Sequence, residues 1–379
     1  MVEEDYTAEK AADAWDKLKH KIVLGILRHK KAAKVSLKNT YRKKMKRLYR
    51  RYDQQMDREA VAVREGRDQL QGKTFTDLLH VISETKRNWL RSRQRRLFRS
   101  HTWRRGQTTK AMFQRISCRF GDNVIPTLRP AEGNPKRGVF EKAEILADAW
   151  SPILQGSATR AGKAIVVEWM PAGSTDDVSD LETQTLFTTE TLDAAFKACK
   201  SGKACGPDRL GNDWYIHYSH ELILLMLKLF RLWYNAHVCP SSFVETDVFC
   251  LKKKGNGSNP LNYRPLSLLN TDYKLFTRVI ATAFRRTLDS RVHPHQHGFV
   301  PTRDIHAVLD YFMAAQATVP QSPELRDAVV LLLDFAKAYD TLDREFLYAV
   351  LSRHGYPPHL VEVIRTLHTG TSGRFLANG

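Results

Sequence analysis

The chain has 379 residues, 42% of them hydrophobic, which is enough to bury cores for two or three domains. It carries 60 Lys and Arg against 41 Asp and Glu, a formal net charge of +19 at pH 7, and this surplus favours a polyanionic partner such as nucleic acid. Five cysteines without a C-x-x-C pair argue against a disulfide framework or a cysteine-based zinc site, and fit a reducing compartment, the nucleus or the cytoplasm.

The beginning of the chain, MVEEDYTAEK, is acidic and polar and predicts no targeting peptide. The longest apolar run, near residues 222–229, is too short to cross a bilayer. We therefore expect no membrane partner.

Most of the excess charge lies in the first hundred residues, which hold 27 Lys and Arg against 13 Asp and Glu. Residues 28–51 contain twelve basic residues and no acidic one. Apolar residues recur there at spacings of three and four, which predicts a helix with one apolar stripe. The stripe consists of Leu37, Tyr41, Met45, Leu48 and Tyr52.

A second basic block, residues 86–105, mixes arginines with aromatic residues. Its candidate nucleic-acid contacts are Arg93, Arg95 and Arg96. Guanidinium groups neutralise phosphates, and the neighbouring rings of Trp89, Phe98 and Trp103 offer stacking faces. A pair of solvated helices or a coiled-coil arm would give the same pattern, but the charge imbalance favours phosphate binding.

Proline and glycine punctuate residues 121–179 and predict a loop-rich connector around one helix, residues 141–150. A further helix is expected after Thr188 and Thr189, with Glu190 in its first turn. The turn-rich loop 201–208, SGKACGPD, precedes a strongly apolar helix over about 220–237. Gly255, Gly257 and Pro260 suit the tip of a hairpin between two strands.

The five aliphatic residues 329–333 predict a strand buried on both faces. Asp334 ends this run, and residues 335–351 have helical spacing of apolar residues. A carboxylate at the end of a buried strand is well placed to hold a divalent metal beside phosphate oxygens. The alternative is that Asp334 caps the helix that follows.

Four segments resemble motifs of the reverse transcriptases of non-LTR (LINE-type) retrotransposons. LLLDFAKAYDTLDREFL resembles motif A, D-x-x-K-A-[FY]-D, and LKKKGNGSNPLNYRPLSLLNTDYKLFTRVIA resembles the fingers motif of that group. HPHQHGFVPTRDIHAVLDYF resembles the next motif, Q-x-G-F with an arginine following, and SGKACGPDRLGNDWY resembles the K-A-P-G-P-D-G element that precedes them all. The four occur in family order over about residues 190–379.

The resemblance implies an RNA-directed DNA polymerase of α+β fold. Its partners would be an RNA template, a DNA primer and deoxynucleoside triphosphates, and its cofactor Mg²⁺; no particular oligomeric state is implied. The expected organisation is a basic helical arm over 1–110, a connector over 111–189, and reverse transcriptase fingers with an incomplete palm over 190–379.

The resemblance also implies roles for single residues. Asp334 would ligate the catalytic Mg²⁺ ions with help from the Phe335 carbonyl, and Tyr339 would be the steric gate that excludes a ribose 2′-hydroxyl. The groups that would clamp the incoming triphosphate are Arg264 and one of Lys252, Lys253 and Lys254. The residues that would shape the template path and brace fingers against palm are Gln296, Gly298, Phe299 and Arg303.

Two departures from the family pattern bear on activity. Cys205 stands where the K-A-P-G element has its proline, and these 379 residues contain no [FY]-x-D-D element. We therefore expect a truncated chain that is inactive by itself. One alternative is a non-catalytic module that binds RNA or single-stranded DNA. An unrelated metal-dependent phosphotransferase is disfavoured, because Ala336 stands where a D-x-D site needs its second acid.

Overall fold

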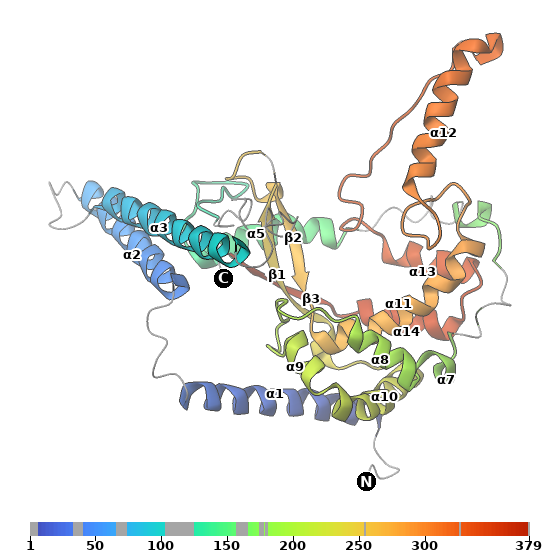
Figure 1. Ribbon diagram of the computed structural model, residues 1–379, viewed down its shortest axis with the longest axis horizontal. Coiled ribbons are helices and arrows are strands. Elements are labelled where there is room, and N and C mark those ends of the chain that lie inside the picture. The colour runs from blue at the N-terminus through green and yellow to red at the C-terminus, as the bar shows by residue number, and fades with distance from the viewer. Residues whose placement is uncertain are drawn as a thin grey trace.

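The computed structural model combines helices with one small sheet, which confirms the expected α+β class (Figure 1). It describes residues 7–32, 41–65, 74–102, 125–156, 166–173, 178, 181–253, 255–325 and 327–377. Within these residues no helix is both long enough and apolar enough to cross a membrane.

Helices that are far apart in the sequence share one large apolar core. Among them are α1 (Ala8–Ala32), α7 (Thr183–Leu186), α8 (Thr189–Lys197), α9 (Asn212–His217), α10 (Ser219–Ala236), α11 (Thr271–Arg291) and α14 (Pro358–His368). Phe187 stacks on Phe276 with ring centroids 5.4 Å apart, and Phe230 meets the same ring edge-on at 5.1 Å. Trp15 of α1 is 3% exposed in this core. The first helix is therefore packed into the helical body.

Two helices of this body begin or end as their sequence predicts. The Thr188 hydroxyl accepts a hydrogen bond from the Thr191 amide at 3.2 Å, so α8 starts where a cap was expected, with Glu190 in its first turn. The apolar helix expected over 220–237 is α10, which ends at His237 in the left-handed conformation with φ 53°. Both predictions are confirmed.

A histidine pair joins the end of α10 to the start of α14. Nε2 of His237 and Nδ1 of His359 lie 2.7 Å apart, so one ring donates a proton and the other accepts it. Burial, and next the neighbouring His237, lowers the pKa of His359. Protonating both rings removes the acceptor and places two positive charges side by side.

We expect the protein to lose stability as the pH falls from about 7.5 to 5.5, because an unfolded histidine, with a pKa of about 6.5, then binds protons that folded His359 resists. The stabilisation is present above the unfolded pKa and is lost as pH falls through the lowered folded value. Burial lowers the pKa of His354 and His368 in the same direction, whereas Asp208, whose pKa is raised to about 6, acts oppositely. Urea unfolding midpoints across this range should fall less steeply for His359→Gln. An equally steep fall would assign the effect to other groups.

The sheet has the order β2-β1-β3. Strand β1 (Glu245–Lys252) pairs antiparallel with β2 (Tyr263–Leu268) and parallel with β3 (Ser372–Leu376). Helix α5 (Val139–Leu154), which contains the helix expected over 141–150, covers one face. Its Trp150, 0% exposed, packs in a cluster with Val248 and Phe375.

Helices α2 (Tyr41–Arg64) and α3 (Phe75–Thr102) pack side by side as a hairpin (Figure 1). Met45 and Leu48 of the expected stripe are buried against Ile82 of α3, so the apolar stripe is confirmed where it is described. Leu37 lies outside the described residues. Tyr41 stacks on Trp89 with ring centroids 4.4 Å apart, and one face of the Trp89 ring is therefore occupied within the hairpin.

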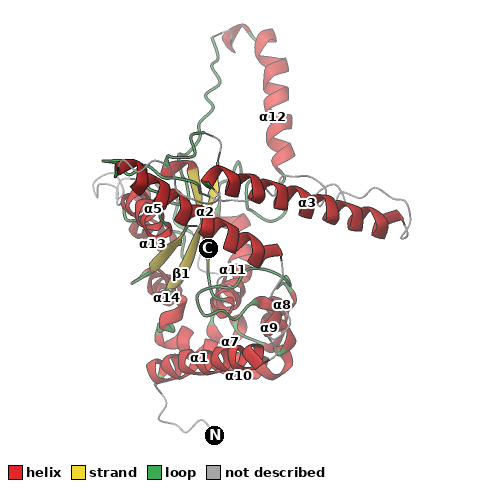
Figure 2. Ribbon diagram, turned by 90° about the vertical axis from the view of Figure 1, so that its left-hand side faces the viewer, coloured by secondary structure: helices red, strands yellow, loops and turns green. Residues whose placement is uncertain are grey.

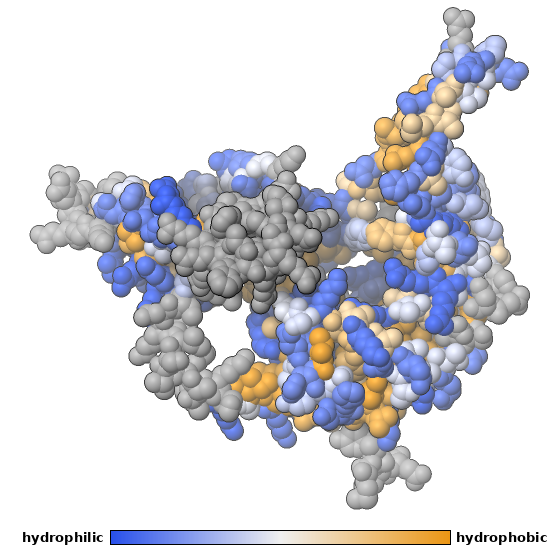
Figure 3. Space-filling model, viewed as in Figure 1, coloured by the Kyte–Doolittle hydropathy of each residue, from blue (hydrophilic) through white to orange (hydrophobic). Residues whose placement is uncertain are grey.

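Helix α12 (Ile305–Thr318) projects from the body and buries none of its side chains (Figures 1 and 2). Orange apolar residues are visible along this projection in Figure 3. The remaining elements are α13 (Arg344–Arg353), η2 (Ser241–Phe243), η3 (Pro260–Asn262), η4 (Val319–Gln321) and η5 (Pro323–Leu325).

The prediction of a buried strand over residues 329–333 is wrong. These residues have no regular structure, and their side chains are between 62% and 87% exposed. An aliphatic run forms a strand only beside another strand that satisfies its backbone groups, and here none of the described strands lies next to it. The helix expected over 335–351 begins only at Arg344, because Asp343 caps it by accepting from the Phe346 amide at 2.9 Å. Asp334 caps no helix.

Candidate nucleotide and nucleic-acid interface

The β1–β2 hairpin is closed by a tight, hydrogen-bonded tip. Gly255 has φ +110°, a conformation that side chains rarely adopt. The Tyr263 hydroxyl donates to the Gly257 carbonyl at 2.7 Å, and the Lys253 amide donates to the Asn262 carbonyl at 2.7 Å. The turn expected from Gly255, Gly257 and Pro260 is thus confirmed, and it holds the basic residues of the tip at fixed positions.

The register of this hairpin separates the basic side chains between two faces. Lys252 pairs with Tyr263, which is buried on the side of α5, whereas Arg264 pairs with Leu251 on the opposite side. Side chains alternate along a strand, so Lys253 follows Leu251 onto the face of Arg264. Lys252, Lys253 and Arg264 are all exposed. Lys254 lies outside the described residues.

The three candidate residues of motif A are exposed. Phe335 and Tyr339 are 84% and 79% exposed, and the Asp334 side chain is exposed as well. The segment is tied to the rest of the structure at Lys337, whose Nζ lies 5.3 Å from the centre of the Trp150 ring. Among the described residues no hydrogen bond or ion pair joins Asp334 or Tyr339 to Arg264 or Lys253.

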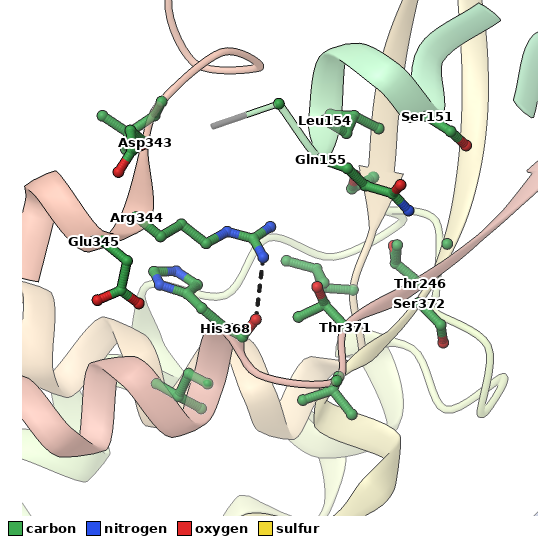
Figure 4. Close-up of a pocket in the computed structure, with 18 of the residues that line it drawn as sticks. Ser151, Leu154, Gln155, Thr246, Asp343, Arg344, Glu345, His368, Thr371 and Ser372 are labelled. Atoms are coloured by element: carbon green, nitrogen blue, oxygen red, sulfur yellow. Dashed lines mark hydrogen bonds between the residues drawn. The ribbon is translucent and has the colours of Figure 1, made fainter. Parts of the chain in front are cut away.

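A cavity of about 1420 Å³ opens between the end of α5, the sheet and the start of α13. Figure 4 shows Thr246 and Ser372 of neighbouring strands on one side of it, with Arg344 and His368 on the other. The Arg344 guanidinium donates to the His368 carbonyl at 3.1 Å. Burial, and next the Arg344 charge, lowers the pKa of the His368 ring. Neither Asp334, Tyr339 nor Arg264 lines this cavity.

The loop before α12 is organised by one arginine. Arg303 donates to the His293 carbonyl at 2.7 Å and to the Gln296 carbonyl at 3.0 Å, and its Nε lies 2.9 Å from an oxygen of Asp289. Gln296 in turn donates to the Gly298 carbonyl at 3.0 Å. Phe299, with φ 65° and 83% exposed, points away from the protein. Arg303 therefore holds the loop, and Phe299 is the aromatic surface that the loop presents.

The α2–α3 hairpin presents a row of basic side chains. The exposed ones described in the first half of α2 are Lys44, Lys46, Arg47, Arg50 and Arg51. None of these five has an acidic partner among the described side chains. Arg93, Arg95 and Arg96 lie within α3, but their side chains are outside the described residues.

Sequence patterns did not reveal a buried charge cluster where α1 meets the loop 201–208 and the start of α11. The ammonium of Lys19, 2% exposed, lies 2.8 Å from Asp272, 3.0 Å from Asp16 and 3.6 Å from Asp208. Asp208 belongs to the SGKACGPD loop, and Asp272 begins α11. In the sequence, Lys19 is marked only by its spacing of three or four residues from apolar and acidic residues of the same helix. Many lysines share this spacing, so it does not predict a buried ion pair.

The described part of the chain contains no group of three or more His, Cys, Asp or Glu side chains placed to hold a metal ion. Asp334 supplies one carboxylate that is exposed to solvent. The donor set that is described therefore does not fit a Mg²⁺ site, which needs several oxygen ligands around the ion.

Residues 251–379 match the family model for reverse transcriptase (RNA-dependent DNA polymerase). The end of β1, the whole of β2, α11, α12 and the motif A segment all lie in this part of the chain, which is thus similar to reverse transcriptases.

A curated protein is similar over a longer part of the chain. Over 264 residues the chain is 25% identical to the transposon TX1 uncharacterized 149 kDa protein of Xenopus laevis. The alignment covers 67% of this chain and 19% of that protein, so the chain spans about a fifth of the length of the relative it matches. The two comparisons support the resemblance to non-LTR retrotransposon reverse transcriptases that the motifs indicated.

Proposed function

We propose that this chain forms the fingers and part of the palm of an RNA-directed DNA polymerase, which extends a DNA primer along an RNA template of a retrotransposon. The observation that carries the proposal is the β1–β2 hairpin, which presents Arg264 and Lys253 on one exposed face within the residues that match the family. In this proposal α1 belongs to the polymerase body, since Trp15 and Lys19 are buried there, and α2–α3 is the basic arm.

Arg264 and Lys253 are proposed to bind the triphosphate of the incoming deoxynucleotide. A guanidinium and an ammonium on the same face can approach phosphate oxygens together, whereas Lys252 is directed to the other side of the hairpin. Phosphoryl transfer builds negative charge on these oxygens, so fixed cations favour it. Of the three lysines at the tip, Lys253 is therefore our candidate.

The motif resemblance assigns Asp334 and Phe335 to metal binding and Tyr339 to deoxynucleotide selection, but the described donors by themselves do not fit a Mg²⁺ site. Two-metal transfer holds the ions about 3.5–4 Å apart on several carboxylates, and these 379 residues contain no [FY]-x-D-D element to complement Asp334. Four described cysteines are free thiols, in keeping with a proposed nuclear or cytoplasmic location.

We expect the purified 379-residue chain not to extend a DNA primer annealed to an RNA template in the presence of Mg²⁺ and deoxynucleotides. Asp334 alone cannot fix two ions, and residues 329–333, which should carry it, form no strand. The measurement is primer extension by the wild-type chain beside Asp334→Ala, with both giving the same background.

Extension that disappears in Asp334→Ala would contradict this expectation and reveal a complete site. The second candidate function, a non-catalytic RNA-binding module, is favoured by the basic row on α2, which has no acidic partner among the described side chains. It predicts that Arg264→Ala leaves deoxynucleotide binding unchanged, whereas the polymerase proposal predicts weaker binding in that variant.

A further inference from the structure

A fully buried carboxylate on the central strand holds two arginines from distant parts of the chain. Asp247 of β1 is 0% exposed. Its Oδ1 accepts from Nε and Nη2 of Arg374 on β3 at 3.0 and 2.7 Å, and its Oδ2 lies 3.1 Å from Nη2 of Arg209. Arg374 is 63% exposed and Arg209 52% exposed. The acid is therefore inside, and both guanidinium groups reach solvent.

The register places this group on the face of the sheet opposite α5. Val248 and its even-numbered neighbours face α5, so Asp247 and Leu251 face the other way, together with Arg264 of β2. Leu251 and Leu266 on that side are 38% and 46% exposed. This face is thus exposed at Leu251 and Leu266, and at Asp247 the two guanidinium groups are what a ligand can contact.

Arg209 occupies a position that its motif normally gives to glycine. The K-A-P-G-P-D-G element ends in glycine, and here SGKACGPD is followed by Arg209. The backbone keeps the conformation suited to glycine, with φ 65°, and the Arg209 amide donates to the Gly206 carbonyl at 3.1 Å. Residues other than glycine rarely adopt this conformation, and such strained positions cluster at functional sites.

The charge on this face is positive toward solvent. The strand register places Arg264 and Arg374 on this face together with two carboxylates, buried Asp247 and exposed Glu245, and Arg209 reaches it from a loop through its ion pair with Asp247. Asp208, adjacent to Arg209, is directed instead to Lys19 at 3.6 Å. Each guanidinium has five N–H donors, and Asp247 uses only a minority of those of Arg209 and Arg374. Donors remain for an anion outside.

The spacing of the arginines distinguishes between phosphate ligands. Arg264 of β2 pairs with Leu251, and Arg374 of β3 pairs with Asp247. The two partner positions are four residues apart on β1, and β2 and β3 lie on opposite sides of that strand. The backbone positions of Arg264 and Arg374 are therefore separated by roughly 13 Å along the strands and by two strand spacings of about 4.8 Å across the sheet. One triphosphate held at Arg264 does not reach both arginines beside Asp247, whereas a nucleic-acid strand crossing the sheet does.

We propose that Arg209 and Arg374, positioned by buried Asp247, form a binding site for backbone phosphates of single-stranded RNA, separate from the nucleotide position at Arg264. The inference rests on the proposed function, because it takes the polymerase template as the ligand. The arginines bind directly, and Asp247 is a positioning residue that holds both guanidinium groups at the surface.

The test is Arg209→Gly, which removes the guanidinium and restores the residue that suits the backbone, so folding is preserved and Arg374 still pairs with Asp247. The probe is a short labelled single-stranded RNA, titrated at several salt concentrations between about 50 and 200 mM. We expect affinity to fall about tenfold and the slope of log K against log salt to shrink by about 0.7, the value for one phosphate contact. Arg285→Ala, an exposed arginine of α11 without a described partner, removes the same charge elsewhere and should change neither quantity comparably.

Unchanged affinity and slope in Arg209→Gly, or equal losses in Arg285→Ala, would overturn the site while leaving the proposed function standing. Failure of the wild-type chain to bind RNA would overturn both. A second arm titrates a deoxynucleoside triphosphate, which Arg209→Gly should bind as the wild type does. Weaker nucleotide binding with unchanged RNA binding would assign these arginines to the triphosphate, against the proposal.

Discussion

Replacing Lys19 by methionine is expected to lower the free energy of unfolding by about 3–5 kcal/mol, the cost of breaking a buried ion pair from one side. Lys19 is 2% exposed, and its ammonium touches Asp272 at 2.8 Å, where Asp272 is itself 0% exposed. Methionine fills a similar volume but leaves the carboxylate without its cation. Urea unfolding at neutral pH measures the change.

The cluster around Lys19 is acidic, so its single cation matters more than in an isolated pair. Burial lowers the pKa of Lys19, but the carboxylates of Asp272, Asp16 and Asp208 together raise it, and the net pKa is raised. Burial, and next the charge of Asp272, raises the pKa of Asp208 to about 6. Trp15 donates to Asp272 at 2.8 Å and helps to hold it. Removing Lys19 therefore leaves more than one carboxylate uncompensated.

Two variants separate charge from packing. Lys17→Met, on the same helix but exposed, should change stability by less than about 0.5 kcal/mol. Lys19→Met combined with Asp272→Asn removes the unpaired charge and should recover part of the loss, since contacting residues are coupled. Equal stability of Lys19→Met and Lys17→Met would show that α1 is held without the cluster.

Neutralising the exposed basic row of α2 is expected to weaken RNA binding by two to three orders of magnitude at low salt. The variant changes Lys44, Lys46, Arg47, Arg50 and Arg51 to glutamine. If each contacts one phosphate, the slope of log K against log salt should shrink by roughly 3.5, at about 0.7 per contact for single strands. Affinity for RNA and single-stranded DNA, measured against salt, provides both quantities.

The control replaces five exposed basic residues elsewhere in the described chain. They are Lys10, Lys17, Lys21, Lys200 and Arg285. Similar losses in the two variants would attribute binding to net charge rather than to α2. Deleting the first 120 residues is a poorer experiment, because it also removes Trp15 and Lys19 from the core.

The sequence by itself determined the features that depend on near neighbours. The stripe through Met45 and Leu48, the cap at Thr188 and the turn at Gly255 were all predictable, because each follows from spacing or backbone conformation within a few residues. The family resemblance was also readable, since motif order is a property of the sequence, and residues 251–379 match the reverse transcriptase model.

Only the tertiary structure decided features that need a partner far along the chain. The aliphatic run 329–333 looked like a buried strand, but a strand requires a neighbour to pair its backbone, and these residues stay exposed. Lys19 meets Asp272 across 253 residues, and Arg374 meets Asp247 across 127. No period or motif encodes such contacts. They arise because folding packs α1 against α10 beside the start of α11 and lays β3 beside β1, and these packings place the charges together.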